Sequence, residues 1–308
     1  MKKRMAMLTA ILMAAALMGC GNKTESAAPA PESTVESEAE EEVEEEADED
    51  EDFDDEAEVP SYDVNFDEPV VLTAEDVTLT ISGARIDEYD YYQLKTLVEN
   101  NGSTECEVNV LHAVVNGIEV YPVYDEYIAA GESINEPIEF YREELTKAGI
   151  EEYTDIMLEI EISDEETESV GNFTIHVYPL GEDKAGQQYT RPDEDTDVLV
   201  TDNDLFKMAA ISFGVDDVWG YLADFYFENK TDQTLTFEAK DVTVNGVAID
   251  PYFYQEVAAG AVADYYMVWN TADLEENEID TVEEIKFILS VTDEDGNEVY
   301  VNAVQLNP

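Results

Sequence analysis

The sequence predicts an all-β protein in which two tandem β-sandwich domains follow a disordered acidic tether. The first observation is a duplication, because from about Asp87 to Glu165 every position has a counterpart 129 residues later without a gap. The second is an alternation of apolar and polar residues within each copy, the period of a strand with one buried face. The third is the set of Asn, Asp and Gly turn signals between these runs. The period far exceeds the roughly 20–50 residues of solenoid repeats, so each copy is a whole domain.

The matched positions extend along both copies. They include Asp87 with Asp216, Glu99-Asn100 with Glu228-Asn229, Val115-Asn116-Gly117 with Val244-Asn245-Gly246, Ala129-Ala130-Gly131 with Ala258-Ala259-Gly260, and Asp164-Glu165 with Asp293-Glu294. Residues that both copies share report what the fold requires. Residues that differ between the copies cannot be essential to both.

The expected elements of the first copy follow in chain order. Alternating runs predict strands around Val77–Ile81, Cys106–Val110, Met157–Ser163 and Phe173–Val177, and Phe287–Val291 is the counterpart of the third run. Asn-Gly at 116–117 and at 245–246 tolerates the positive φ angles of tight hairpin turns.

One short helical segment interrupts the strands of each copy. It is expected from Arg142 to Lys147, ended by Gly149, and again from Ala272 to Asn277 with Thr271 as its N-cap.

About seven strands in roughly 110 residues, with one helical turn before the penultimate strand, favour an immunoglobulin-like β-sandwich. The Cys, Trp, Cys core of antibody domains is absent, and a small barrel is the alternative architecture. The expected organisation is a signal peptide at 1–19, a tether at 20–60, a first sandwich at 61–180, a linker at 181–199 and a second sandwich at 200–308.

The N-terminus has the features of a secretory signal. Lys2, Lys3 and Arg4 precede an apolar run that ends in Leu17-Met18-Gly19-Cys20. This ending resembles the bacterial lipobox, which implies cleavage before Cys20 and its acylation, with palmitate among the chains. Two acyl chains hold a protein stably on a membrane. We therefore expect a lipoprotein on the extracellular face of the cell membrane; an ordinary signal peptide cut elsewhere is the alternative.

The chain is strongly acidic, with a formal charge of −62. Between Thr24 and Pro60 there are 19 acidic residues and no basic ones, so this segment is expected to stay disordered and extended. Residues 61–308 still carry 57 acidic against 10 basic side chains. Nucleic acid and anionic lipid are therefore poor partners. Capture of cations or a basic partner, and a high-salt habitat, remain alternative explanations of the charge.

No catalytic constellation is evident, so we expect a protein that is not an enzyme. Cys106 alternates with Val108 and Val110, which places its thiol in the core. His112 and His176 have no histidine counterpart in the other copy and no neighbours that complete a zinc site, so both are expected to be exposed strand residues.

No cofactor is expected unless calcium binds at one of two turns. Asp202 and Asp204 flank Asn203, and Asp293 and Asp295 belong to an Asp-Glu-Asp-Gly-Asn turn. Clustered carboxylates are hard oxygen ligands of the kind that calcium takes. Neither segment matches a helix-loop-helix calcium loop, and Asp-Gly is also an ordinary hairpin turn.

An aromatic stretch follows the Asn-Gly turn in each copy. It comprises Tyr121, Tyr124 and Tyr127 in the first copy and Tyr252, Phe253 and Tyr254 in the second. Exposed tyrosines offer large contact areas at small entropic cost, so these residues are candidate contacts for a surface protein or a glycan. Packing against the sheet edge is the alternative.

The chain resembles acidic surface lipoproteins of Gram-positive, clostridia-like bacteria that carry immunoglobulin-like domains of unknown function. The resemblance covers residues 70–308 and rests on turn and core residues: Phe227-Glu228-Asn229-Lys230-Thr231, Val242 to Gly246, Val257 to Gly260, Asp273-Leu274 and Ile285 to Asp293. It implies a fold and brings no binding or catalytic residues. The expected function is a membrane-anchored interaction or presentation module; the alternatives are a mechanical spacer of the cell envelope and, more distantly, a carbohydrate-active extracellular enzyme.

Overall fold

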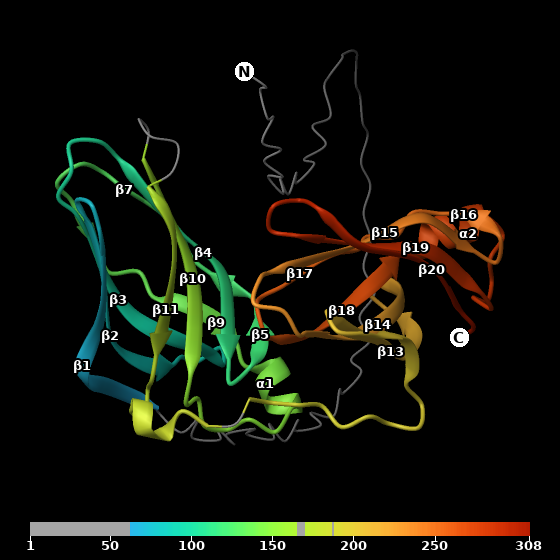
Figure 1. Ribbon diagram of the computed structural model, residues 1–308, viewed down its shortest axis with the longest axis horizontal. Coiled ribbons are helices and arrows are strands. Elements are labelled where there is room, and N and C mark those ends of the chain that lie inside the picture. Colours follow the sequence, from blue (N-terminus) through green and yellow to red (C-terminus); the bar gives the residue numbers. More distant parts are fainter. Residues whose placement is uncertain (1–61, 165–169, 187) are drawn as a thin grey trace, which may run out of the picture. The chain divides into compact units, whose positions relative to one another are not determined.

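The computed structural model describes residues 62–164, 170–186 and 188–308, and almost all regular structure in these ranges is β-strand (Figure 1). The strands form two successive β-sandwiches, each with its own hydrophobic core, as the sequence predicts. We call the part from β1 to β11 repeat 1 and the part from β12 to β20 repeat 2. The predicted signal peptide and the predicted tether lie outside the described residues.

The elements of repeat 1 are nine strands of two to twelve residues, a short helix and two further strands. They are β1 Asp63–Ala74, β2 Val77–Ile86, β3 Tyr91–Asn100, β4 Cys106–Val115, β5 Ile118–Val120, β6 Pro122–Val123, β7 Asp125–Ile128, β8 Ser133–Ile134, β9 Ile138–Tyr141, α1 Glu143–Lys147, β10 Ile156–Asp164 and β11 Gly171–Val177.

The elements of repeat 2 follow the 3-10 turn η1 Glu182–Lys184. They are β12 Val198–Asp202, β13 Phe206–Asp216, β14 Gly220–Asn229, β15 Leu235–Val244, β16 Val247–Ala248, β17 Tyr254–Val257, β18 Val262–Trp269, α2 Thr271–Glu276, β19 Ile285–Asp293 and β20 Glu298–Leu306. The 129-residue offset holds at the level of elements, since β4 and β15, and β10 and β19, correspond residue for residue.

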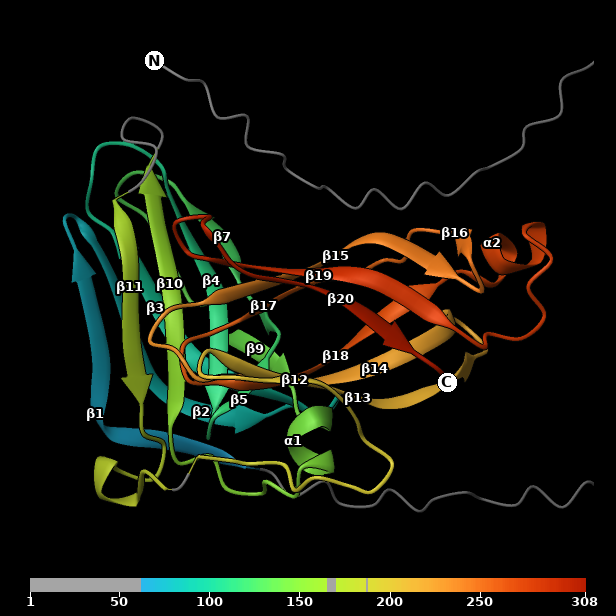
Figure 2. The ribbon, with the colours of Figure 1, turned by 45° about the vertical axis from the view of Figure 1, so that its right-hand side comes forward.

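Each repeat consists of two facing sheets. In repeat 1, strands β1-β2-β3-β9-β6 form one sheet, and β11-β10-β4-β5 form the other, with β7 also paired to β4. In repeat 2, the corresponding layers are β12-β13-β14-β18 and β20-β19-β15-β16 (Figure 2). Neighbouring strands within each of these layers are antiparallel.

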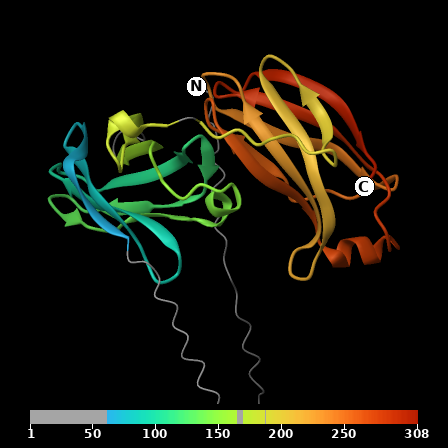
Figure 3. The same ribbon diagram turned by 90° about the horizontal axis from the view of Figure 1, so that it is seen from below.

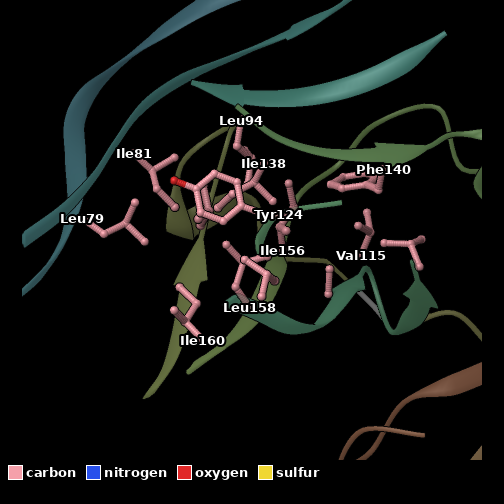
Figure 4. Packing of buried hydrophobic residues seen from close by; sticks show 14 of the residues in the cluster. Leu79, Ile81, Leu94, Val115, Tyr124, Ile138, Phe140, Ile156, Leu158 and Ile160 are labelled. Atoms are coloured by element: carbon pink, nitrogen blue, oxygen red, sulfur yellow. The ribbon is translucent and has the colours of Figure 1, made fainter. Parts of the chain in front are cut away.

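The core of repeat 1 shows how the alternating pattern is used (Figure 4). Leu79, Ile81 and Leu94 come from one sheet, while Leu158 and Ile160 come from the other, and all five are fully buried. Intervening polar side chains stay on the outer faces of their strands. Burial of one face per strand is what fixes the period of two.

The residues shared by both copies are those that tie the loops to the sheets. Buried Asn100 donates from Nδ2 to the carbonyls of Thr104 and Ile128, and its counterpart Asn229 donates to Gln233, Val257 and Ala258. These amides satisfy carbonyls that would otherwise be buried without partners, so they are required in both sandwiches.

The predicted hairpin turns are also present in both repeats. Asn116 and Asn245 have φ angles of 50° and 52°, and each is followed by a glycine with positive φ. The side-chain oxygen of Asn245 accepts bonds from the amides of Glu283 and Glu284, and Asn116 makes the equivalent bonds to 154 and 155. The repeated Asn-Gly therefore joins this hairpin to the start of a later strand.

The helix prediction needs one correction. Helix α2 begins at Thr271, but its N-cap is Asn270, whose side chain accepts a hydrogen bond from the amide of Ala272 at 2.9 Å. Asn270 has the extended backbone angles that an N-cap needs, whereas Thr271 is already helical. Adjacent Asn and Thr are both good capping residues, so sequence alone did not separate them.

The segment between β11 and β12 is held by several contacts and has no strand of its own (Figure 3). The amide of Tyr189 donates to the carbonyl of Asn116 at 2.8 Å. Arg191 forms a two-pronged ion pair with Asp197 at 2.6 and 3.0 Å and lies over the ring of Tyr226. These contacts attach the connection to both repeats.

Candidate functional site

The two repeats are joined by a pairing between β5 and β18. Ile118 and Val262 are parallel partners, and the amide of Val262 donates to the carbonyl of Gly117 at 2.8 Å. This pairing merges one layer of each repeat into a sheet of nine strands. We call this contact region, formed by β5, β17 and the start of β18, the junction.

His112 is buried at the junction, which corrects the expectation that it is an exposed strand residue. It is 8% exposed, and its Nδ1 contacts Oε1 of Glu119, itself 6% exposed. The second oxygen of Glu119 accepts a hydrogen bond from the amide of Ala258 in repeat 2 at 2.7 Å. These contacts join residues that lie on different strands and in different repeats, so the local pattern did not reveal them.

The surroundings of His112 favour its protonated form. Burial alone lowers the pKa of His112, but the hydrogen bond and charge of Glu119, with the charges of Glu159 and Glu256, raise it above the ordinary value. Nε2 of His112 lies 3.9 Å from Oε2 of Glu256. Burial raises the pKa of Glu159, whose carboxylate faces the same group. Glu119 thus contacts His112 within repeat 1 and the amide of Ala258 in repeat 2.

Four of the six predicted aromatic contact residues are exposed. Tyr121, Tyr127, Tyr252 and Tyr254 have exposed fractions between 47% and 68%. The prediction is wrong for Tyr124, which is 5% exposed and packs in the core (Figure 4). The chain crosses from one sheet to the other between β6 and β7, so Tyr124 lies between the layers. Phe253 is half-buried and packs against the core of repeat 2.

Three tyrosines gather where the repeats meet. Tyr121 of repeat 1 lies 6.0 Å from the ring of Tyr265 and donates a hydrogen bond to Oε1 of Gln255 at 3.1 Å. The hydroxyl of Tyr252 also interacts with Tyr265 and contributes, after burial, to raising the Tyr265 pKa to about 12. We call Tyr121, Tyr252 and Tyr265 the junction tyrosine cluster.

Sequence reasoning missed Tyr265. Its counterpart in repeat 1 is Glu136, so the duplication did not draw attention to it. The one local pattern at this position is the Tyr265-Tyr266 pair in an otherwise alternating strand. This pair indicates a strand, because tyrosine favours strands, but it does not indicate a contact. Contact with Tyr121 depends on the pairing of β5 with β18.

The structure does not assemble the predicted calcium ligands. Among the described residues, no group of three or more His, Cys, Asp or Glu side chains is arranged to hold a metal ion. Asp202 pairs with Lys230 at 2.5 Å, and Asp293 accepts hydrogen bonds from the backbone and side chain of Asn297. Asp204 and Asp295 are exposed turn residues. These carboxylates cap turns and balance a lysine.

The remaining candidates are in ordinary surroundings. Cys106 is buried as predicted, and burial raises the pKa of its thiol. His176 is exposed, as predicted, and pairs with Asp155 at 2.7 Å. Within the described ranges, no helix combines the length and apolar character needed to cross a membrane. Cys20 lies outside these ranges.

No protein-family model and no curated protein matches the chain. Among solved structures it is similar to the YadV chaperone, with a TM-score of 0.23, 12% identity and coverage of 75% of this chain and 100% of that one. The exo-chitosanase CsxA of Amycolatopsis orientalis gives a TM-score of 0.21 and 10% identity, covering 72% of this chain and 26% of the enzyme. A protein of unknown function from Porphyromonas gingivalis W83 gives 0.20 and 11%, covering 77% and 93%. At these TM-scores the similarities carry no argument about function.

Proposed function

We propose that this protein is a non-enzymatic, lipid-anchored extracellular protein that contacts a partner through the junction tyrosine cluster. The observation that carries the proposal is the position of this cluster, in which residues from both repeats contribute to one aromatic surface. Tyr121 and Tyr252 are 47% and 68% exposed. Large rings with a polar tip are the side chains that most often anchor recognition surfaces.

The junction supports this role because it orients the tyrosines. The Glu119 bridge, the β5–β18 pairing and the Tyr121–Gln255 hydrogen bond all lie next to the cluster. A surface whose side chains are already positioned loses less entropy on binding. We infer that the joint serves to present the cluster.

The partner contact is tested by photocrosslinking in intact cells. A photoreactive phenylalanine analogue at position 252 is expected to give discrete adducts. The matched control is the same analogue at Tyr89, which is 70% exposed and lies in the turn between β2 and β3, outside the elements that form the junction. Adducts that also disappear after Tyr121→Ala support the cluster as the contact. Equal adduct patterns at positions 252 and 89 contradict it.

The anchor rests on Leu17, Gly19 and Cys20 and has its own test. Mass spectrometry of the N-terminal peptide of the mature chain is expected to show an acylated Cys20, and Cys20→Ser is expected to remove the chain from the membrane fraction. A mature chain that starts elsewhere and lacks acyl groups contradicts the anchor without affecting the partner contact.

A mechanical spacer is the second candidate, and the continuous nine-stranded sheet favours it. A stiff pair of domains on an extended acidic tether holds a chain end away from a membrane surface. The two functions differ in the effect of Tyr121→Ala in a chain that carries the photoreactive analogue at position 252: the substitution removes adducts from a binding module and leaves the function of a spacer intact.

A further inference from the structure

Three large apolar side chains project from the turn between β13 and β14. Val215, Val218 and Trp219 are 76%, 81% and 61% exposed. We call these three residues the repeat 2 tip. Single exposed apolar residues are common on protein surfaces, but a group of them marks a contact surface. Tryptophan is among the residues that contribute most of the binding energy at protein interfaces.

The backbone of this turn is fixed by its own contacts. Oδ1 of Asp216 accepts hydrogen bonds from the amides of Val218 and Trp219, both at 2.8 Å. Gly220 has a φ angle of 104°, and a Cβ at this position would clash with the carbonyl oxygen of Trp269. The turn therefore packs directly on the backbone at the end of β18. Side chains that are already positioned lose less entropy on binding.

Repeat 1 forms the same turn with a different surface. Asp90 stands at the position of Trp219 and pairs with Arg142 at 2.5 Å. Ile86 stands at the position of Val215 and packs against the core of repeat 1. The fold therefore requires neither an exposed tryptophan nor an exposed valine at these positions. Exposed apolar residues that the fold does not require point to a contact outside the chain.

The surroundings of the tip are acidic. Asp216 and Asp217 belong to the turn, and the hydrogen bonds from the two backbone amides hold the pKa of Asp216 below its usual value. Helix α2 lies at the same end of repeat 2 as the turn (Figure 3). Residues 208–229 and 262–285, which include this turn, β14, β18 and α2, contain twelve acidic side chains and no Lys, Arg or His. A partner that fits the tip therefore carries positive charge beside an apolar face.

The charge also distinguishes between the occupants of such a surface. Two copies of this chain that met tip to tip would bring Asp216 and Asp217 against the same residues of the other copy, and like charges in an interface oppose association. An anionic membrane surface is repelled for the same reason. A basic amphipathic segment covers the apolar side chains, pairs with the carboxylates and places a cation over the face of Trp219.

We propose that the repeat 2 tip is a docking site for a basic amphipathic segment of another protein. Apolar side chains of the segment cover the tip, and its Lys or Arg residues pair with Asp216 and Asp217. The tip lies at the opposite end of β14 from the junction, because Glu228 near the far end of β14 pairs with Val262. The two places are roughly 25 Å apart along the strand. The site is therefore separate from the partner contact proposed for the junction.

Tryptophan fluorescence tests the contact directly, because the chain has two tryptophans and Trp269 is 1% exposed. Acrylamide quenching of the full chain therefore reports on Trp219. A model peptide of leucine and lysine at helical spacing is expected to protect Trp219 saturably. Peptides with serine in place of leucine, or glutamate in place of lysine, are expected to give no protection. Equal protection by the serine peptide, or none by the leucine-lysine peptide, overturns the proposal.

Two variants locate the binding of the leucine-lysine peptide by titration calorimetry. Trp219→Asp introduces the residue of repeat 1 and is expected to weaken binding about tenfold or more. Because this change adds a negative charge, attraction to the acidic surface or to the acidic residues of 24–60 alone would strengthen binding instead. Val218→Ser changes a fully surface-facing side chain, is expected to weaken binding about threefold, and remains informative if Trp219→Asp fails to fold.

Tyr89→Ser is the matched control, because Tyr89 is exposed at the same turn of repeat 1. It is expected to leave the affinity for the peptide unchanged. Unchanged affinity in Trp219→Asp and Val218→Ser, or an equal loss in Tyr89→Ser, overturns the proposal. Two further results also overturn it. Self-association in sedimentation that Trp219→Asp abolishes would assign the tip to a second copy, and protection of Trp219 by phosphatidylcholine vesicles but not by the peptide would assign it to a lipid surface.

Discussion

Strands β5 and β16 occupy the same position in repeat 1 and repeat 2 but have opposite surroundings. β5 is buried at all three residues and pairs with β18, whereas β16 has two residues and pairs only with β15 among the described strands. The residues that differ between the copies account for this. His112 and Glu119 correspond to Asp241 and Ala248, so repeat 2 lacks the charged pair that accepts the neighbouring domain.

The junction is asymmetric, because the two repeats contribute different strands to it. Repeat 1 supplies the accepting edge, repeat 2 supplies the docking amides of Ala258 and Val262, and the second edge lacks the means to accept a third domain. Shared residues maintain the sandwich, and copy-specific residues attach one sandwich to the other.

The largest effect is expected from Glu119→Ala. It leaves a buried His112 and the amide of Ala258 without their partner, which costs about 3 kcal/mol in the free energy of unfolding. The control Glu256→Gln removes one charge from the same cluster at a half-exposed position and is expected to cost about 0.5 kcal/mol. Urea unfolding followed by circular dichroism measures both. Similar costs for the two variants would show that the bridge contributes little.

A smaller effect is expected from Gly117→Ala compared with Gly246→Ala. Both glycines have positive φ, at 93° and 83°, so each alanine variant meets backbone strain of about 1 kcal/mol. A Cβ on Gly117 would also lie 3.2 Å from the amide nitrogen of Tyr189 and closer still to Gln188, whereas nothing lies within 4 Å at Gly246. The cost at 117 is therefore expected to be about 2 kcal/mol.

Tryptophan fluorescence helps to separate these effects, because Trp219 and Trp269 both belong to repeat 2. A change at Gly117 that shifts circular dichroism without shifting the fluorescence transition acts on repeat 1 alone. Equal costs at the two glycines would contradict a role for the connection in packing on repeat 1.

The smallest effect is a dependence of stability on pH. Because the folded-state pKa of His112 is raised, its stabilisation is complete below the unfolded pKa of about 6.5 and is lost as pH rises through the folded pKa. The raised pKa of Glu159 acts in the same direction, since its ionisation in the folded state is disfavoured. We expect the difference in unfolding free energy between the unmodified chain and His112→Gln to fall as the pH rises from 6 to 9.

A pH-independent difference for His112→Gln would mean that the histidine is not charged in the folded protein.

Local features of the fold could be predicted from the sequence, since their causes are local. One buried face per strand fixes the alternation at Leu158 and Ile160, and the φ angles of tight turns select Asn116-Gly117. Cys106 followed the same alternation into the core. Each of these patterns occurs in both copies, so the two copies support the same assignment of strands and turns.

The site depended on contacts that no local pattern encodes. His112 has the spacing of an exposed strand residue but is buried beside Glu119, whose carboxylate also accepts a hydrogen bond from repeat 2. Tyr124 and Tyr127 belong to one tyrosine-rich stretch, but the crossing between sheets buries the first and leaves the second exposed. The rings of Tyr62, Tyr92 and Tyr153 pack together in repeat 1, although these residues lie far apart in the sequence.

The burial of β5 also bears on how each domain avoids aggregation. An open strand edge with apolar side chains is a template for pairing between molecules, and proteins protect such edges by covering them or by keeping them short. Repeat 1 covers Ile118 and Val120 with its neighbour, while repeat 2 ends its equivalent edge after two residues. Expressed alone, the first domain would expose an apolar strand edge that the second domain does not have. Because the first domain is also synthesised first, it depends on the second for its solubility.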